Sequence, residues 1–279
     1  MKLVARILLL FMIAQLLGIY TGMIVLTDIV SNPYVQDLIV TSNAADPANA
    51  LFFMVYVLLG AVIMILLIKY FKIHPNLFKL LEFILVSTSS SIVFYAFLRL
   101  MHGYEISMLT GIAMGLIFSV LRFFLPSLKN TAAVLATAGV GVIFGMSLGL
   151  LPVVLFLILL AIYDYLSVFA TKHMVELAEF VVQRDLAFTV TARAPPLKPG
   201  AKEQRIDLGT GDMIAPIMLE VSAMTFGLVA VIFVFAGATI SMALFLTLVW
   251  RRKMVLPALP PIVLGMIVSL LIGFLLGAY

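Results

Sequence analysis

Two aspartates, Asp164 and Asp212, interrupt stretches of sequence that are otherwise apolar and helix-compatible. A carboxylate surrounded by hydrocarbon is costly, so its presence indicates a functional role. Two carboxylates that meet in a low-dielectric site cannot both ionise at low cost, and they share one proton as a pair. Such a pair performs acid–base hydrolysis, because one member deprotonates a water while the other donates to the attacked carbonyl oxygen. This chemistry requires no metal ion and no organic cofactor.

Glycine and proline residues mark two further segments that could shape a site around these aspartates. Gly209, Thr210 and Gly211 directly precede Asp212. Because glycine lacks a Cβ, the backbone can bend there and a substrate strand can approach closely. The second segment, Leu256-Pro257-Ala258-Leu259, opens the last apolar run. It can be interpreted as a helix that begins with proline or as a non-helical wall beside the site.

The composition places these segments in a membrane. Of 279 residues, 64% are hydrophobic and only 11% are charged, whereas about 25% are charged in soluble domains. Residues 7–27, 47–68 and 254–279 contain no charged side chain, and each run is long enough for the ~20 residues that cross hydrocarbon. The absence of cysteine excludes disulfides, thiolate metal sites and a cysteine nucleophile. The sequence therefore predicts an all-α polytopic membrane protein.

Charge clusters and glycine or proline breaks divide the apolar sequence into nine predicted transmembrane helices. These cover residues 5–27, 50–69, 80–99, 106–124, 131–149, 152–170, 211–230, 233–250 and 257–277. We expect one integral membrane domain in three parts: a five-helix scaffold (1–149), helix six with Asp164 and a cytoplasmic lid (150–208), and helices seven to nine (209–279). The turn between helices seven and eight is assigned to Gly237 or the small residues near Ala236.

The distribution of Lys and Arg predicts the orientation. With a cytoplasmic N-terminus, 16 of the 17 basic residues fall on the cytoplasmic side and only Arg99 falls outside, as expected for a membrane protein. Nine helices then place the C-terminus outside. The net charge of +4 thus follows from topology and does not indicate a nucleic-acid partner. In this arrangement Asp164 and Asp212 reach a similar depth on the cytoplasmic side.

Residues 171–208 form the long hydrophilic connection between helices six and seven. Its first part, 173–188, has apolar residues at the spacing of an interfacial helix. The following stretch, 193–200, contains three prolines and a glycine, which prevent helix formation. We expect this second part to be a flexible lid over the site.

Three motifs, in order, resemble those of the presenilin and signal peptide peptidase family of GxGD intramembrane aspartyl proteases. They are Tyr163-Asp164, Gly209-Thr210-Gly211-Asp212 and Pro257-Ala258-Leu259, and the resemblance covers nearly the whole chain. It implies an aspartic endopeptidase that cleaves transmembrane segments, with Asp164 and Asp212 as the catalytic aspartates. It also implies that the remaining motif residues and Leu256 bind substrate or shape the active site.

Orientation and loops refine this resemblance. A cytoplasmic N-terminus is typical of presenilins, and the compact loops are typical of an archaeal presenilin-like homologue, for which a plasma-membrane location is expected. Thr210 replaces the hydrophobic residue that is usual in eukaryotic presenilins. The connection before helix seven lacks the large presenilin loop that is cut during maturation. The expected partners are transmembrane peptides and the lipid bilayer. The sequence leaves open whether the chain forms a homo-oligomer, and nothing in it requires accessory subunits.

A transmembrane substrate hides its amides in helical hydrogen bonds, so it must unwind before water can reach a carbonyl group. We expect residues 205–208 to hold the unwound substrate by strand pairing. Proline at position 206 should then abolish cleavage with the fold intact.

Other interpretations compete with this one. Glu220 also lies in apolar sequence, and we interpret it as a hydrogen-bonded structural residue because two carboxylates suffice for catalysis. A proton- or ion-coupled transporter would also place carboxylates inside a bundle, but its sites lie between internal repeats and broken helices, which this sequence lacks. Type IV prepilin peptidases carry a GxGD motif as well, but they do not share the Pro257-Ala258-Leu259 segment.

Overall fold

The computed structural model describes residues 2–29, 33–69, 75–171, 186–194, 204–252 and 256–279. Helices dominate this part of the chain. They are α1 (Lys2–Ile29), α2 (Pro33–Gln36), α3 (Ala48–Lys69), α4 (Pro75–Leu98), α5 (Tyr104–Phe124), η1 (Pro126–Leu128), α6 (Lys129–Ser147), α7 (Leu150–Leu166), η2 (Ser167–Thr171), α9 (Thr210–Ala223), η3 (Met224–Phe226), α10 (Leu228–Arg252) and α11 (Leu259–Leu275).

A helix occupies each of the nine predicted positions, although not all of these helices have the length of a full span. Within the described residues, seven helices are long and apolar enough to cross a membrane. Two others are shorter: α9 has 14 residues and α11 has 17. The break predicted between residues 149 and 152 is confirmed, because α6 ends at Ser147 and α7 begins at Leu150.

The predicted turn at Gly237 or Ala236 is wrong. The chain turns earlier, at Gly227, whose φ of 98° lies in a region that glycine adopts without steric cost. Gly237 instead lies inside α10, where a Cβ would stand 2.5 Å from the backbone oxygen of Gly265 in α11. Gly237 is therefore needed for the close approach of two helices, not for a change of direction.

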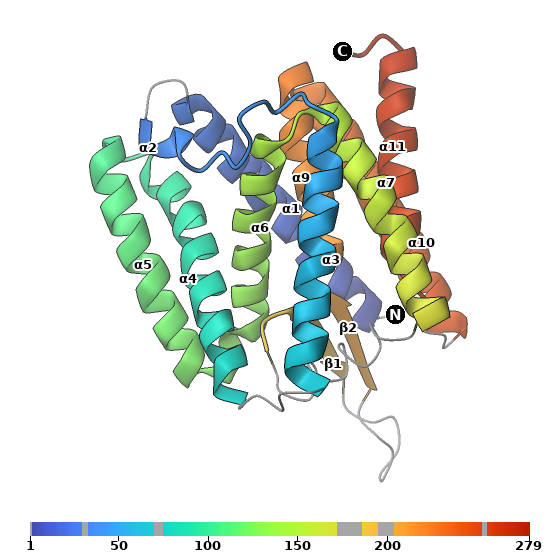
Figure 1. Cartoon of the computed structure of the whole chain (residues 1–279), viewed down its shortest axis with the longest axis horizontal. Coiled ribbons are helices and arrows are strands. Elements are labelled where there is room, and N and C mark those ends of the chain that lie inside the picture. The colour runs from blue at the N-terminus through green and yellow to red at the C-terminus, as the bar shows by residue number, and fades with distance from the viewer. Residues whose placement is uncertain (1, 30–32, 70–74, 172–185, 195–203, 253–255) are drawn as a thin grey trace.

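The helices form a bundle with the short α9 near its centre (Figure 1). In the view of Figure 1, α4 and α5 lie at one side, α1, α3, α6 and α9 in the middle, and α7, α10 and α11 at the other side. The N-terminus lies toward the end that carries the two strands, and the C-terminus lies at the opposite end. Helix α9 contacts α1, α6, α7, α10 and α11, so the segment that begins with Asp212 is enclosed by the bundle.

Glycines in α6 allow α9 to pack against it closely. A Cβ at Gly141 would lie 2.6 Å from the Ile217 side chain, and one at Gly145 would lie 2.7 Å from the backbone oxygen of Met218. Ile217 and Met218 are fully or almost fully buried. Small residues at this spacing fix the position of α9, because close helix packing in a membrane depends on van der Waals contact between backbones.

Two antiparallel strands, β1 (Thr189–Ala194) and β2 (Gln204–Gly209), lie just before α9. The segment 205–208 is therefore a strand, as expected, but its partner in this structure is β1. Strand β1 was not predicted: residues 193 and 194 belong to it rather than to a lid. Residues 186–188 are not helical, and most of the predicted interfacial helix and of the lid lies outside the described residues.

An ion pair at the end of the bundle opposite the strands joins α1 to α4. Arg99 donates to both carboxylate oxygens of Asp28, at 2.8 and 3.1 Å, and the Tyr95 hydroxyl donates to Asp28 Oδ2 at 2.5 Å. Asp28 is almost completely buried, whereas a third of the Arg99 side chain is exposed. The pair thus satisfies a carboxylate that has little access to water.

Replacing Arg99 by methionine should lower the stability of the protein by about 1–3 kcal/mol, because it leaves the Asp28 carboxylate short of donors in a buried position. Thermal unfolding in detergent would measure this. The double variant Arg99→Met with Asp28→Asn should recover most of the loss. A single variant as stable as the parent would contradict a stabilising role for this pair.

Candidate active site

Helix α7 carries Asp164 in its last turn. The Asp164 Oδ2 atom accepts a hydrogen bond from the backbone N–H of Leu259 at 3.3 Å, so α7 is bound at this point to the start of α11. Directly after α7 the backbone widens into a short π-helix, Ser167–Thr171, a feature that is frequent at functional sites. The Asp164 side chain is half-buried.

Asp212 lies in the first turn of α9. A Cβ at Gly209 would stand 3.4 Å from Asp212 Oδ2. A side chain at position 209 would therefore lie in van der Waals contact with the carboxylate. Asp212 too is half-buried, so neither aspartate is completely enclosed by the surrounding side chains.

The fold brings Asp164 and Asp212 together although 48 residues separate them in sequence. Helices α7, α9 and α11 contact one another, and the two carboxyl groups are close enough to interact electrostatically. Two carboxyl groups in such a position favour the state in which one of them is protonated. The arrangement can therefore supply a proton acceptor and a proton donor at one place.

The segment Leu256-Pro257-Ala258-Leu259 lies beside Asp164. Residues 256–258 are not helical, and α11 begins at Leu259 with Pro260 in its first turn. Pro257, Ala258 and Leu259 are buried, and Leu256 is half-buried. Both interpretations of this segment thus apply: it starts a helix with proline, and it forms a non-helical wall next to an aspartate.

The other predicted residues differ in their surroundings. Tyr163 is half-buried next to Asp164. Gly211 is exposed, and a Cβ there would meet no atom within 4 Å, so the backbone before Asp212 faces open space. Thr210 donates to the Phe188 backbone oxygen twice, from its N–H at 3.0 Å and from its hydroxyl at 3.1 Å. Thr210 therefore binds the start of α9 to the start of β1, a role that the sequence did not predict.

The outer edge of β1 is covered by side chains of other elements. Asn130 of α6 accepts from the Thr191 N–H at 2.9 Å and donates to the Thr191 carbonyl oxygen at 2.8 Å. Arg6 of α1 donates to the Arg193 carbonyl oxygen at 3.1 Å. Asn130 and Arg6 had no assigned role in the sequence, because their partners are 61 and 187 residues away.

Polar side chains connect the two strands to each other and to α6. Thr191 donates to Asp207 at 2.5 Å, Lys129 donates to Thr191 at 3.1 Å, and Arg205 pairs with Asp207 at 2.6 Å. The hairpin is thereby held against the bundle at the start of α9. Among the described residues, no three His, Asp and Glu side chains gather as in a metal site.

Glu220 lies two turns beyond Asp212 in α9 and is fully buried. Neither of its carboxyl oxygens has a hydrogen-bond partner within the described part of the chain, so the expected hydrogen-bonded role is not seen. A buried carboxyl group without partners destabilises the folded state.

Replacing Glu220 by methionine should therefore raise stability, by about 1–3 kcal/mol, because the substitution removes an unsatisfied polar group and keeps a similar volume. The midpoint of thermal unfolding would measure the gain, and Glu220→Gln should give a smaller one because it keeps two polar atoms. A lower midpoint in Glu220→Met would show instead that the carboxyl group has a stabilising partner, such as an ordered water.

The fold and the site define a class of protein: an α-helical multi-pass membrane protein that carries one carboxyl group on each of two adjacent helices. The family model described as signal-peptide peptidase, presenilin aspartyl protease matches residues 8–278. The chain belongs to this family and is an intramembrane aspartyl protease, an aspartic endopeptidase. The family confirms the resemblance found in the sequence and favours the protease over the transporter.

Solved structures of the same family have this fold. A presenilin family intramembrane aspartate protease in space group C222 superposes with a TM-score of 0.69 at 24% identity, covering 98% of this chain and 99% of that one. A structure of a presenilin family intramembrane aspartate protease in space group P2 gives a TM-score of 0.61 at 25% identity, covering 94% and 96%. No curated protein matches the chain significantly.

Proposed function

We propose that Asp164 and Asp212 are the catalytic pair that hydrolyses peptide bonds within transmembrane segments. This proposal is supported by the position of the two carboxyl groups on the adjacent helices α7 and α9, close enough to interact electrostatically, with Asp164 bound to the Leu259 N–H. The ionised carboxylate removes a proton from a water, whose oxygen attacks the scissile carbonyl carbon. The protonated partner donates to the carbonyl oxygen as it gains negative charge, and proton return to the amine nitrogen releases the two products.

The free edge of β2 is the proposed binding site for the unwound substrate. Thr191 directs its N–H toward Asn130, away from β2, so its partner Asp207 directs its own N–H and C=O away from β1 in an alternating antiparallel ladder. The same alternation applies to Arg205. In the described part of the chain these backbone groups of Arg205 and Asp207 have no hydrogen-bond partner, and such an edge accepts an additional strand.

The motif residues around the pair have proposed roles in holding this strand. Gly211 leaves open space before Asp212, which supports close passage of a substrate backbone. Gly209 lies next to the Asp212 carboxylate, and Thr210 fixes the start of α9 against Phe188. The segment from Leu256 to Leu259 and Tyr163 form the wall on the Asp164 side.

The proposed topology has nine membrane-crossing helices, with the N-terminus in the cytoplasm and the C-terminus outside. The positions of the two termini, toward opposite ends of the bundle (Figure 1), support an odd number of crossings. The hairpin lies at the end nearer the N-terminus, so the catalytic pair faces the cytoplasmic side in this topology.

Cleavage of a peptide with a single transmembrane segment, by the purified protein in lipid, tests the function. Two products are expected from the parent protein, and none from Asp164→Ala or from Asp212→Ala. Unaltered cleavage by either variant would refute the assignment of the pair. Substrate-independent proton or ion flux through liposomes would favour the transporter instead.

A further inference from the structure

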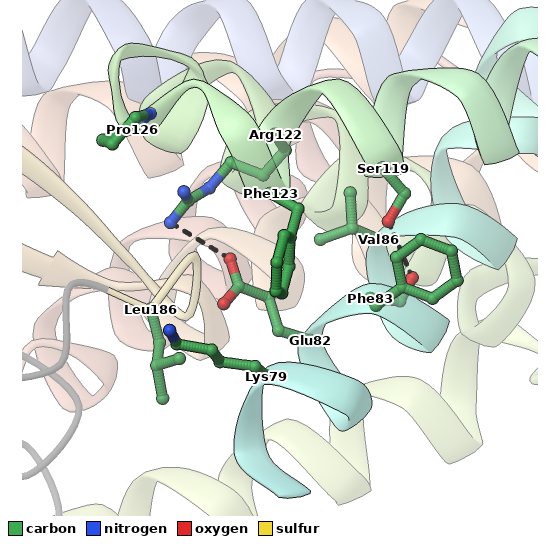
Figure 2. Close-up of a pocket in the computed structure, with 9 residues that line it drawn as sticks. All are labelled: Lys79, Glu82, Phe83, Val86, Ser119, Arg122, Phe123, Pro126 and Leu186. Atoms are coloured by element: carbon green, nitrogen blue, oxygen red, sulfur yellow. Dashed lines mark hydrogen bonds and ion pairs between the residues drawn. The ribbon is translucent and has the colours of Figure 1, made fainter. Parts of the chain in front are cut away.

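A second site lies apart from the paired aspartates, between α4 and α5, at the end of the bundle that carries the hairpin (Figure 2). It is a pocket with a volume of about 180 Å³. The pocket is lined by Lys79, Glu82, Phe83 and Val86 of α4, by Ser119, Arg122 and Phe123 of α5, and by Pro126 and Leu186. Three charged side chains in one small pocket are unusual for a surface that faces lipid.

The negative charge in this pocket is already neutralised. Glu82 Oε1 forms an ion pair with Arg122 Nη2 at 3.2 Å (Figure 2), and the same oxygen accepts a hydrogen bond from the Ala187 N–H at 3.1 Å. The side chains of Glu82 and Arg122 are only 10% and 12% exposed. Glu82 therefore holds Arg122 in place and leaves little negative charge to repel an anion.

Lys79 supplies an excess positive charge. Its ammonium group lies 5.7 Å from the centroid of the Phe123 ring, and within the described residues it has neither an ion pair nor a hydrogen bond. With Glu82 balanced by Arg122, the three charged groups sum to one net positive charge. The pocket is thus suited to an anionic group that accepts hydrogen bonds from Lys79.

The surface around the pocket is apolar and exposed. Leu80 of α4 is 52% exposed, and Phe123 and Phe124 of α5 are 59% and 73% exposed, as expected for side chains that contact acyl chains. Lys79 and Arg122 lie near the ends of their helices, where basic residues meet the headgroup layer. A lipid whose chains lay along α4 and α5 would place its phosphate at the pocket.

We propose that this pocket binds the phosphate group of an anionic phospholipid of the surrounding membrane, with Lys79 as its hydrogen-bond donor beside the Glu82–Arg122 ion pair. Glu82 connects the bound lipid to the protease site, because it also holds Ala187, two residues before β1. The bound lipid would then sit beside the segment that leads into the hairpin.

To test this proposal, the purified full-length protein is titrated with phosphatidylglycerol and followed by native mass spectrometry. The measured quantity is the affinity of the lipid that binds most tightly. Lys79→Gln should weaken that affinity roughly five- to tenfold, the effect of one basic residue near an anionic lipid. Lys79→Arg should restore most of it. Lys2→Gln is the matched control, because Lys2 is exposed toward the same end of the bundle but does not line the pocket, and its affinity should stay within twofold of the parent.

Two further ligands separate the sources of the phosphate. Diacylglycerol with the same chains lacks the phosphate, and glycerol phosphate lacks the chains, so neither should bind the parent protein at the concentrations that saturate it with phosphatidylglycerol. Equal affinity in Lys79→Gln and the parent, an equal loss in Lys2→Gln, or equal binding of diacylglycerol would overturn the proposal. Equally tight binding of glycerol phosphate would show a site for a soluble phosphate rather than for a lipid.

Discussion

Asp164→Asn and Asp212→Asn should each lower kcat/KM for a transmembrane peptide by about 10⁴-fold or more, because an amide can neither deprotonate a water nor exchange a proton with its partner. Each asparagine keeps a carbonyl oxygen of the same size. At position 164 it can therefore still accept the Leu259 N–H. The loss should appear in kcat and not in substrate affinity.

The fold of both variants should be retained. Asparagine is neutral and has nearly the size of aspartic acid, so the midpoint of thermal unfolding should not fall. Asp37→Asn is the matched control, since Asp37 is exposed and lies outside the site. The double variant should be no less active than either single variant, because the effects of substituting residues that act as a unit are not additive. Activity above a hundredth of the parent in one single variant would exclude a shared role.

The aspartates and most helices could be predicted because their signals are local. An apolar run of about 20 residues has few alternatives to a membrane helix, and a carboxylate inside such a run stands out from its neighbours. Thus Asp164 and Asp212 could be identified, and the ends of α6 and α7 could be placed at a glycine and proline break. Their pairing was an inference from depth, and the contact among α7, α9 and α11 is a property of the whole bundle.

The parts that could not be predicted depend on distant partners. Strand β1 is held between β2 on one edge and, on the other, Asn130 of α6, which binds the backbone of Thr191. The helical spacing of apolar residues up to position 188 gave no sign of it. The position of the turn likewise depends on distant contacts. Gly237 packs against the backbone of Gly265 and stays inside a helix, whereas the chain turns at Gly227. Sequence alone shows that both residues are glycines.

The register of the hairpin determines which backbone groups can hold a substrate. It therefore determines at which position a proline substitution tests substrate pairing with β2. Thr210 N–H donates to the Phe188 oxygen, so alternation makes Ile206 and Ala192 a hydrogen-bonded pair. Proline at position 206 would therefore break the hairpin itself, and the expectation of an intact fold is wrong for that position. The N–H of Asp207 points to the free edge, so position 207 is the informative one.

Asp207→Pro should lower kcat/KM roughly 10- to 100-fold relative to Asp207→Ala, the cost of one lost hydrogen bond in a low-dielectric site. Both variants lose the carboxylate that binds Thr191 and Arg205, so the comparison isolates the backbone N–H. Their unfolding midpoints should agree, whereas Ile206→Pro should unfold at a lower temperature because it removes a bond between the strands. Equal cleavage by Asp207→Pro and Asp207→Ala would show that the substrate does not pair with this edge. The proposed pair would then have to receive its substrate from the wall formed by Leu256 to Leu259.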